Sequence, residues 1–259
     1  MISRLLLINL VLIVLYMSVW FMAARQRQRL DTVDSAWGGG FVLLAWVVYV
    51  QQLSWRSLII AILITIWGGR LAYYLIRRSS RRDEDPRYKA MAKKWRGNYW
   101  LRAYLSIFLL QGFLIWLIAL PITLAANNTD ATSLPWVIAV GVLMLLIGFV
   151  VEAVADKQLG DFLANKTNQG KNMDRGLWRY SRHPNYFGEL LQWWAIGIIA
   201  LGTPWTWLGL LGPLVLSLLI VFVSGVPPIE NKRKDNVEYQ TYKQRTSMIV
   251  PLPPRKPIT

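Results

Sequence analysis

Several residue types that carry common enzyme chemistry are absent or nearly absent from this chain. It contains no cysteine, which excludes disulfide bonds and thiolate chemistry. It contains one histidine, His183, which cannot supply the two-histidine helix motif of zinc hydrolases, and we expect no metal site. No Gly-x-Gly-x-x-Gly or Walker sequence follows an expected strand, so neither usual soluble nucleotide fold is indicated. A Ser-His-Asp nucleophile is not indicated either, because His183 stands among arginines.

Charge is also scarce. Charged residues make up 17% of the chain, whereas hydrophobic residues make up 54%. Several apolar runs reach the roughly 18–20 residues that a helix needs to cross a bilayer. The sequence therefore predicts an all-α, polytopic bundle of about seven spanning helices. The expected spans are residues 2–24, 34–50, 58–76, 101–124, 136–155, 186–201 and 207–226. The first run lacks a small-residue cleavage site, so we expect it to be retained.

Lysine and arginine outnumber aspartate and glutamate by 29 to 14, and they gather after the first, third, fifth and seventh spans. This alternation is typical of a membrane topology signal and does not indicate nucleic-acid binding. It predicts an N-terminus outside and a C-terminus in the cytoplasm, with the bacterial inner membrane as the expected location. We expect residues 1–228 to form the bundle and residues 229–259 to form a cytoplasmic tail that packs on a cofactor site. The connection 77–96 is expected to contain a short interfacial helix.

The stretch 175–189 carries the strongest functional signal. It places Arg175, Arg179 and Arg182 beside His183, directly before a predicted helix. Cations before a helix N-terminus, with polar groups inside its first turns, form a receptor for a phosphorylated cofactor. The alternative is an ordinary positive flank of a membrane helix.

The helix that follows carries polar groups on one face. Pro184 fits its first turn, since the missing N–H is unpaired there in any case. Asn185 and Glu189 are four residues apart and therefore project from the same face. An acidic group near lipid depth is costly and by default indicates function.

Glu152 and Asp156 form a second pair four residues apart, at the end of the fifth span. Two ionised carboxylates at this spacing repel, so a cation or a hydrogen-bonding ligand is expected beside them. One interpretation is a lining for the amide, hydroxyls or cationic ring of a cofactor. The other is a salt bridge with Lys157 or Arg179.

The tail repeats an aromatic and basic pattern. Tyr239, Tyr242 and Arg245 are spaced by three residues and share a helix face. Such a face can close over a nucleotide or lie on anionic headgroups, and the sequence leaves both interpretations open. In the second span, Gly38, Gly39 and Gly40 predict close approach of another helix or of a ligand.

The block Gly-Leu-Trp-Arg-Tyr-Ser-Arg-His-Pro-Asn-Tyr-Phe-Gly-Glu at 176–189 resembles the C-terminal motif of the steroid 5α-reductase-like membrane family, most closely its bacterial branch of unknown function. Similar motifs in this chain are Glu84 to Tyr88, Gln111-Gly112, Glu152 with Asp156 to Gln158, and Glu230, Tyr239, Tyr242, Thr246 and Pro251. The resemblance covers about residues 34–251, with a 3-oxo-5α-steroid 4-dehydrogenase-like region from about residue 100. Sterol reductases and membrane methyltransferases of isoprenylcysteine or phospholipids share a similar block.

The resemblance implies an NADPH site on the cytoplasmic side and a lipid-side cavity for an enone. It carries Asp156, Asn185 and Glu189 onto cofactor-binding positions at the nicotinamide end, and Arg182, Arg179 and Lys166 are expected to bind phosphates. The full set of expected cofactor-binding residues is Glu152, Asp156, Lys166, Arg179, Arg182, His183, Asn185, Tyr186, Glu189, Tyr242 and Arg245.

The resemblance also locates candidates for the catalytic groups. Where the steroid reductases have a Gln-Glu pair, this chain has Gln51-Gln52, so the expected acid is missing. Asp34, Gln52 and Tyr73 are the candidates for polarising the substrate carbonyl. We expect an NADPH-dependent reductase acting on a CH–CH group of a hydrophobic small molecule in the bilayer. The alternatives are a methyltransferase using S-adenosylmethionine on a lipid or isoprenoid-like acceptor, and a non-enzymatic lipid-binding protein.

Overall fold

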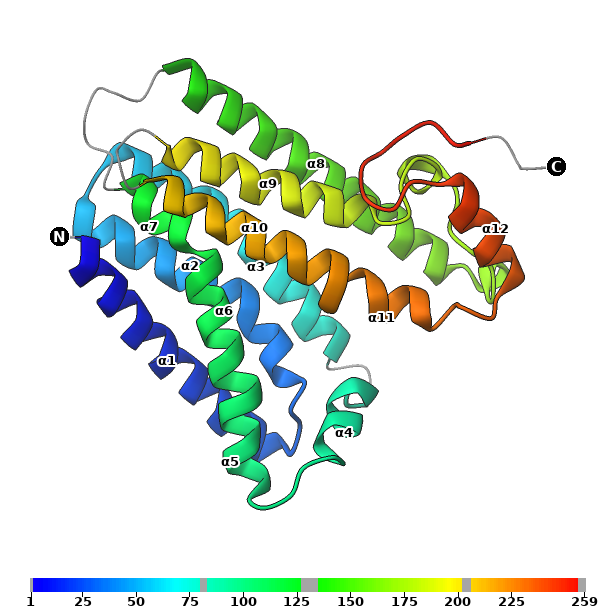
Figure 1. Ribbon diagram of the computed structural model, residues 1–259, viewed down its shortest axis with the longest axis horizontal. Helices are drawn as coiled ribbons and strands as arrows, with labels where there is room; N and C mark the ends of the chain where they lie inside the picture. The colour runs from blue at the N-terminus through cyan, green and yellow to red at the C-terminus, as the bar shows by residue number, and fades with distance from the viewer. Residues whose placement is uncertain (1, 80–82, 127–134, 202–205, 256–259) are drawn as a thin grey trace. The chain divides into compact units, whose positions relative to one another are not determined.

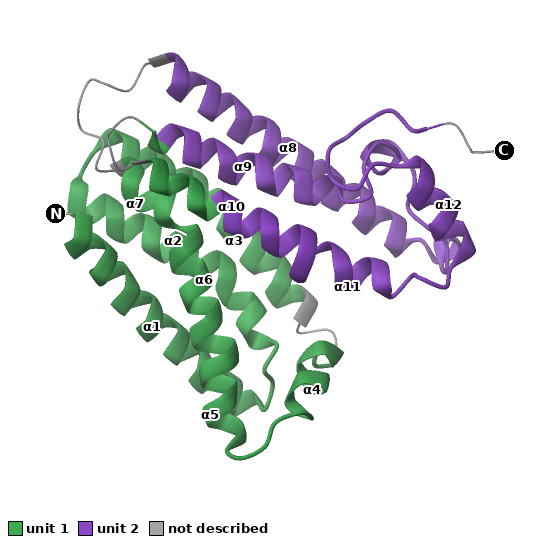
Figure 2. Cartoon of the chain, in the orientation of Figure 1, with its two compact units in different colours: residues 1–133, 200–212 green, residues 134–199, 213–259 purple. Residues whose placement is uncertain are grey.

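The computed structural model describes residues 2–79, 83–126, 135–201 and 206–255, and over these residues it contains helices and no strand (Figure 1). An isolated bridge pairs Ser181 with Ser247. The all-α prediction is therefore confirmed for the described residues. The predicted turn at 202–205 and most of the connection at 125–135 lie outside them. The chain forms two compact units, unit 1 with residues 1–133 and 200–212, and unit 2 with residues 134–199 and 213–259 (Figure 2).

Six helices of the described chain are long and apolar enough to cross a membrane, which supports a multi-pass membrane protein. They are Ile2–Arg27, Thr32–Gln52, Trp55–Arg77, Tyr99–Ala125, Trp136–Ala164 and Trp207–Asn231. Each overlaps one predicted span. The remaining predicted span, 186–201, lies in a helix of 17 residues, Pro184–Ala200, which is shorter than the other six.

Unit 1 is a helical bundle. Its helices are α1 (Ile2–Arg27), α2 (Thr32–Gln52), α3 (Trp55–Ser79), α4 (Pro86–Ala92), α5 (Tyr99–Ala103), α6 (Leu110–Ile118) and α7 (Leu120–Ala126), with a π-helical segment, Tyr104–Leu109, between α5 and α6 and a 3₁₀ turn, Thr206–Leu210. The predicted short helix of the charged connection is α4. It begins where Pro86 occupies the first turn and the Asp85 side chain accepts a hydrogen bond from Arg87 N–H.

The glycine-rich start of α2 packs closely against its neighbours. A Cβ atom added to Gly38 would lie 2.2 Å from the carbonyl oxygen of Gly68 on α3. A Cβ atom on Gly40 would lie 3.2 Å from the Ile115 side chain on α6. The prediction of close helix approach is therefore confirmed, because only a residue without a side chain fits at Gly38.

Unit 2 contains α8 (Pro135–Ala164), a 3₁₀ turn (Lys166–Asn168), a second 3₁₀ turn (Gly176–Arg179), α9 (Pro184–Ala200), a π-helical segment (Leu219–Val223), α11 (Val226–Asn231) and α12 (Val237–Arg245); α10 (Leu211–Leu218) begins in unit 1. Helix α8 continues nine residues beyond its predicted end at 155. The last predicted span, 207–226, is interrupted before its predicted end. The break falls at Ser224 and Gly225, and the prolines lie in the first turn of α11.

Helices α8 and α9 lie side by side in unit 2 (Figure 1). A Cβ atom on Gly188 would come within 2.6 Å of the Gly148 carbonyl oxygen and of the Glu152 amide nitrogen. This contact brings the acidic face of α8 directly against the start of α9. The helix pair therefore positions the polar residues that the sequence analysis selected.

Candidate functional site

The arginine-rich loop between α8 and α9 is anchored on α8 at its start. Gly176 has a positive φ of 57°, a conformation that favours glycine. The Gln158 side chain accepts a hydrogen bond from the Leu177 amide at 3.0 Å, and Trp178 Nε1 donates to the Ala155 carbonyl at 3.1 Å. These hydrogen bonds therefore hold the part of the loop before His183 against α8.

The tail after α12 packs on the same loop. Arg182 N–H donates to the Ser247 carbonyl at 2.8 Å, and Ser181 Oγ donates to the Ile249 carbonyl at 2.7 Å. The hydroxyl of Tyr242 donates to the Trp178 carbonyl. Within unit 2, the tail and the arginine-rich loop between α8 and α9 are therefore held together by hydrogen bonds.

The buried side chain of Arg182 connects the arginine-rich loop to the tail. Its side chain is 8% exposed, its Nε lies 2.9 Å from Glu230 Oε1, and its Nη1 donates to the carbonyls of Lys243 and Thr246. Lys243 Nζ approaches the other oxygen of Glu230 at 2.7 Å. Through these contacts of Nε and Nη1, the buried guanidinium of Arg182 holds the tail in place. Glu230, the acidic partner, was noted in the sequence only as part of a tail motif.

His183 is 3% exposed beside this cluster. Burial lowers the pKa of the His183 imidazole to about 4, although the Glu230 carboxylate at 3.5 Å opposes this shift. The ring stacks on Tyr186 with centroids 5.5 Å apart. His183 is therefore neutral at pH 7 and supplies a stacking surface. It does not add a cation for a phosphate.

A row of amides and carboxylates connects α8 to α9. Asn185 Nδ2 donates to Asp156 Oδ1 at 3.3 Å, and Gln192 Nε2 donates to Glu152 Oε2 at 2.6 Å. The expected hydrogen-bonding partner of Glu152 is thus Gln192, which the sequence analysis did not select although it lies four residues after Gly188. Asn185 Oδ1 is buried and has no hydrogen-bond partner within the described residues.

Glu189 follows Asn185 by one turn of α9 and is partly exposed. A shared helix face for Asn185 and Glu189 is therefore confirmed by the observed helix.

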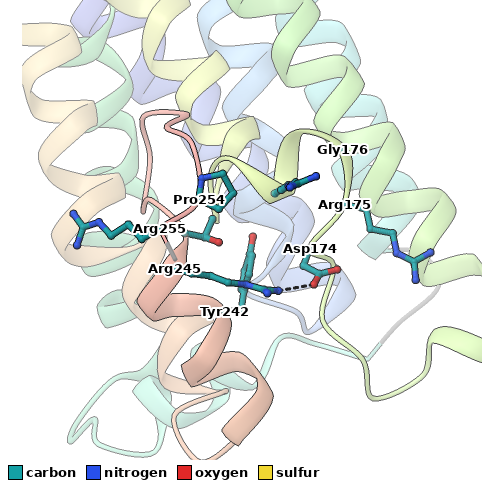
Figure 3. Close-up of a pocket in the computed structure, with 9 residues that line it drawn as sticks. Asp174, Arg175, Gly176, Tyr242, Arg245, Pro254 and Arg255 are labelled. Carbon is teal, nitrogen blue, oxygen red and sulfur yellow. Dashed lines mark hydrogen bonds and ion pairs between the residues drawn. The ribbon is translucent and has the colours of Figure 1, made fainter. Parts of the chain in front are cut away.

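A hollow lies between the arginine-rich loop, α12 and the residues after α12, and we call it the arginine hollow. Its volume is about 560 Å³, and it is lined by Asp174, Arg175, Gly176, Arg179, Tyr242, Arg245, Thr246, Pro254 and Arg255. In Figure 3 Arg245 reaches across to Asp174, and their atoms approach to 2.8 Å. The side chains of Arg175 and Arg255 extend outward from the hollow in that view.

Three of the expected cofactor-binding residues, Arg179, Tyr242 and Arg245, thus line the arginine hollow. Burial raises the pKa of the Tyr242 hydroxyl, so this group stays protonated. Lys166 does not line the arginine hollow. It lies on a separate hollow of about 460 Å³ that includes none of the arginine hollow's residues. Of the three residues expected to bind phosphates, Arg179 thus lines the arginine hollow, Lys166 lines the separate hollow, and Arg182 is buried against Glu230.

Unit 1 contains a different polar cluster, between α2, α4 and α6. The Tyr88 hydroxyl donates to Asp34 Oδ1 at 2.5 Å and accepts a hydrogen bond from Gln111 Nε2 at 3.3 Å. Trp37 Nε1 donates to Gln111 Oε1, and Arg87 Nη2 lies 3.6 Å from Asp34 Oδ2. Tyr88 is 8% exposed, and burial together with the adjacent Asp34 carboxylate raises the pKa of its hydroxyl.

The three catalytic candidates from the sequence do not form one site. Gln52 is 18 residues after Asp34 on the same helix, which separates the two by about 27 Å at the α-helical rise of about 1.5 Å per residue. Tyr73 is 64% exposed and lies 3.3 Å from Arg77. The structure instead pairs Asp34 with Tyr88, which the sequence analysis placed in a family motif without assigning it a role.

The chain is similar in sequence to a protein family and to a curated protein. A family model described as "Protein of unknown function (DUF1295)" matches residues 19–246. Uncharacterized protein C594.04c of Schizosaccharomyces pombe is 32% identical over 195 residues, which make up 61% of this chain and 55% of that protein. The chain thus spans about half the length of this curated relative. No solved structure matches the chain. Because the family model covers most of its length, the chain belongs to the DUF1295 family.

Proposed function

We propose that this chain is a membrane reductase that uses NADPH to reduce a lipid-soluble alkene conjugated to a carbonyl. The observation that carries the proposal is the arginine hollow, a space of about 560 Å³ next to a buried tyrosine, whose lining includes Arg175, Arg179, Arg245 and Arg255. Arginine recognises phosphate by charge and by its fork of N–H donors. A single carboxylate, Asp174, lines the space, so its net charge favours a polyanion.

The α8–α9 row suits the nicotinamide end of the cofactor. A carboxamide carries both a donor and an acceptor, and the unpartnered Asn185 Oδ1 supplies an acceptor for its N–H group. Asp156, 3.3 Å from Asn185 Nδ2, holds that amide in position. When bound, NADPH supplies the hydride, and the residues of unit 2 bind and orient it.

The polar cluster of unit 1 supplies a candidate for the second half of the chemistry. Tyr88 keeps its proton at neutral pH and is positioned by Asp34 and Gln111. Its one proton is donated to Asp34 Oδ1 here, so the hydroxyl would turn from Asp34 to donate to the carbonyl oxygen of the substrate as negative charge develops there. Overall, the reaction would add a hydride from NADPH to the β-carbon and a proton from water to the α-carbon, which would leave a saturated product and NADP⁺.

We further infer that α9 is a seventh span. Its 17 residues extend about 26 Å at about 1.5 Å per residue, close to the hydrocarbon thickness of about 30 Å. Seven spans with basic alternate connections would support a C-terminus in the cytoplasm and an inner membrane location.

A methyltransferase using S-adenosylmethionine is the second candidate, because the α8 carboxylates Glu152 and Asp156 can attract its cationic groups. The arginine hollow disfavours it, since that cofactor has a sulfonium charge and no phosphate.

Thermal unfolding of the detergent-purified protein distinguishes the two. Ligand binding to the folded state raises the melting temperature at concentrations well above Kd. We expect NADPH to raise the melting temperature and S-adenosylmethionine to leave it unchanged. Stabilisation by S-adenosylmethionine alone would reverse the assignment, and a response to neither ligand would leave the lipid-binding alternative.

A further inference from the structure

A second basic hollow lies in unit 2, apart from the arginine hollow. We call it the loop hollow. Its volume is about 460 Å³, and its lining comes from the end of α8, the connection at 165–172, and Arg233 and Asn236 after α11. Lys166, Lys171 and Arg233 supply three cations, and no lining residue is acidic. It shares no residue with the arginine hollow, so a ligand here is additional to the proposed cofactor.

The donors of the loop hollow lack anionic partners. Within the described chain, the side chains of Lys166 and Lys171 form no ion pair or hydrogen bond. Arg233 Nη1 lies 3.5 Å from Asn172 Oδ1, and its guanidinium lies 5.3 Å from the Tyr239 ring centroid. Asn172 Nδ2 is buried and has no acceptor. An unmade hydrogen bond of a buried donor is costly, and here the donor stands among cations, so an anionic oxygen is the matching acceptor.

The position of the loop hollow relative to the spanning helices indicates which anion. One of its walls begins where the spanning helix α8 ends, at Ala164, and the other begins two residues after the spanning segment that ends at Asn231. Leu163, an apolar residue of the lining, is 64% exposed. Cations at the ends of spanning helices, with apolar surface beside them, match a phospholipid, whose headgroup is charged and whose chains are apolar.

We propose that the loop hollow binds the phosphodiester headgroup of an anionic phospholipid. Lys166 and Lys171 neutralise its charge, Asn172 Nδ2 donates to a phosphate oxygen, and Arg233 is held in place by Tyr239. Leu163 lies against the first part of an acyl chain. The site is independent of the proposed reductase activity, because none of its residues lines the arginine hollow.

The test uses the full chain in a neutral detergent, titrated with short-chain phosphatidylglycerol or phosphatidylcholine, with the melting temperature as readout. We expect phosphatidylglycerol to raise the melting temperature and phosphatidylcholine to leave it unchanged. In Lys166→Gln/Lys171→Gln the affinity for phosphatidylglycerol should fall about 30-fold, which corresponds to ~2 kcal/mol for two cations near a headgroup. Lys232→Gln/Lys234→Gln is the matched control, because it removes the same charge from exposed positions that do not line the hollow.

Three outcomes overturn the proposal. One is an unchanged phosphatidylglycerol response in Lys166→Gln/Lys171→Gln, or an equal loss in the control variant. Another is an equal stabilisation by inorganic phosphate, which would identify a free phosphate as the ligand. The third is loss of the phosphatidylglycerol response when NADP⁺ is added, which would make the loop hollow part of the nucleotide site. An absence of any NADPH effect bears only on the proposed reductase activity, so the two proposals fail separately.

Discussion

The two units bury their polar groups in different ways. In unit 1, Asp34, Tyr88 and Gln111 satisfy one another inside the helical bundle. In unit 2, the buried Arg182 forms an ion pair with Glu230 and donates hydrogen bonds to the carbonyls of Lys243 and Thr246. A closed cluster within a bundle suits a group that must keep its proton and its position. In unit 2, the tail instead holds the arginine-rich loop in place. Arg175 and Arg179 of this loop line the arginine hollow and are exposed, so a charged ligand can reach them.

The largest expected effect concerns the ion pair between Arg182 and Glu230 in unit 2. In Glu230→Ala, the buried Arg182 loses its carboxylate, and removal of one partner of a buried ion pair costs about 3–5 kcal/mol. We expect a lower melting temperature and rapid proteolysis of the tail. The control is Asp161→Ala, which breaks an exposed pair with Lys157 and should leave the melting temperature unchanged. Equal effects of the two substitutions would show that the tail is not held by this ion pair.

The next effect separates the roles of the two units. In Tyr88→Phe, the polarising hydroxyl is lost, and we expect turnover to fall about 100-fold, as for removal of one transition-state hydrogen-bond donor. Stabilisation by NADPH should persist, since Tyr88 does not belong to unit 2. Tyr73→Phe is the control, because that exposed hydroxyl contacts Arg77 and should not affect turnover. A Tyr88→Phe protein with full turnover would remove unit 1 from the chemistry.

This contrast also explains what the sequence could predict. Apolar runs and the spacing of Asn185 and Glu189 depend on local helical geometry, so six of the seven predicted spans coincide with helices long enough to cross a membrane, and the shared face is confirmed. Arg179 and Arg182 look equivalent in sequence, yet one lines a hollow and the other is buried. The difference arises from Glu230, which lies 48 residues after Arg182, and such long-range pairing has no local signal. Tyr88 was missed for the same reason, because its partner Asp34 is 54 residues away.

A smaller effect, on NADPH affinity, is expected at the arginine hollow of unit 2. In Arg175→Gln/Arg179→Gln, the arginine hollow loses two cations, and we expect NADPH affinity to fall about 10-fold, which corresponds to about 1.4 kcal/mol. The melting temperature without ligand should not change, since both side chains are exposed. Arg25→Gln/Arg27→Gln, which removes the same charge from unit 1, is the control for a general electrostatic effect. Equal loss of affinity in the two variants would contradict a specific phosphate site.

The smallest effect is the pH dependence that His183, the only histidine of the chain, contributes in unit 2. Its pKa is about 4 in the folded protein, below the ordinary value of 6.5, so the unfolded chain binds a proton more readily. The stabilisation is therefore complete above pH 6.5 and is lost as the pH falls towards 4. From pH 7 to 5.5 the free energy of unfolding should fall by about 1 kcal/mol, and the loss should disappear in His183→Gln. Measured by denaturant titration at each pH, an equal slope in both proteins would show that His183 is protonated as readily in the folded state as in the unfolded chain.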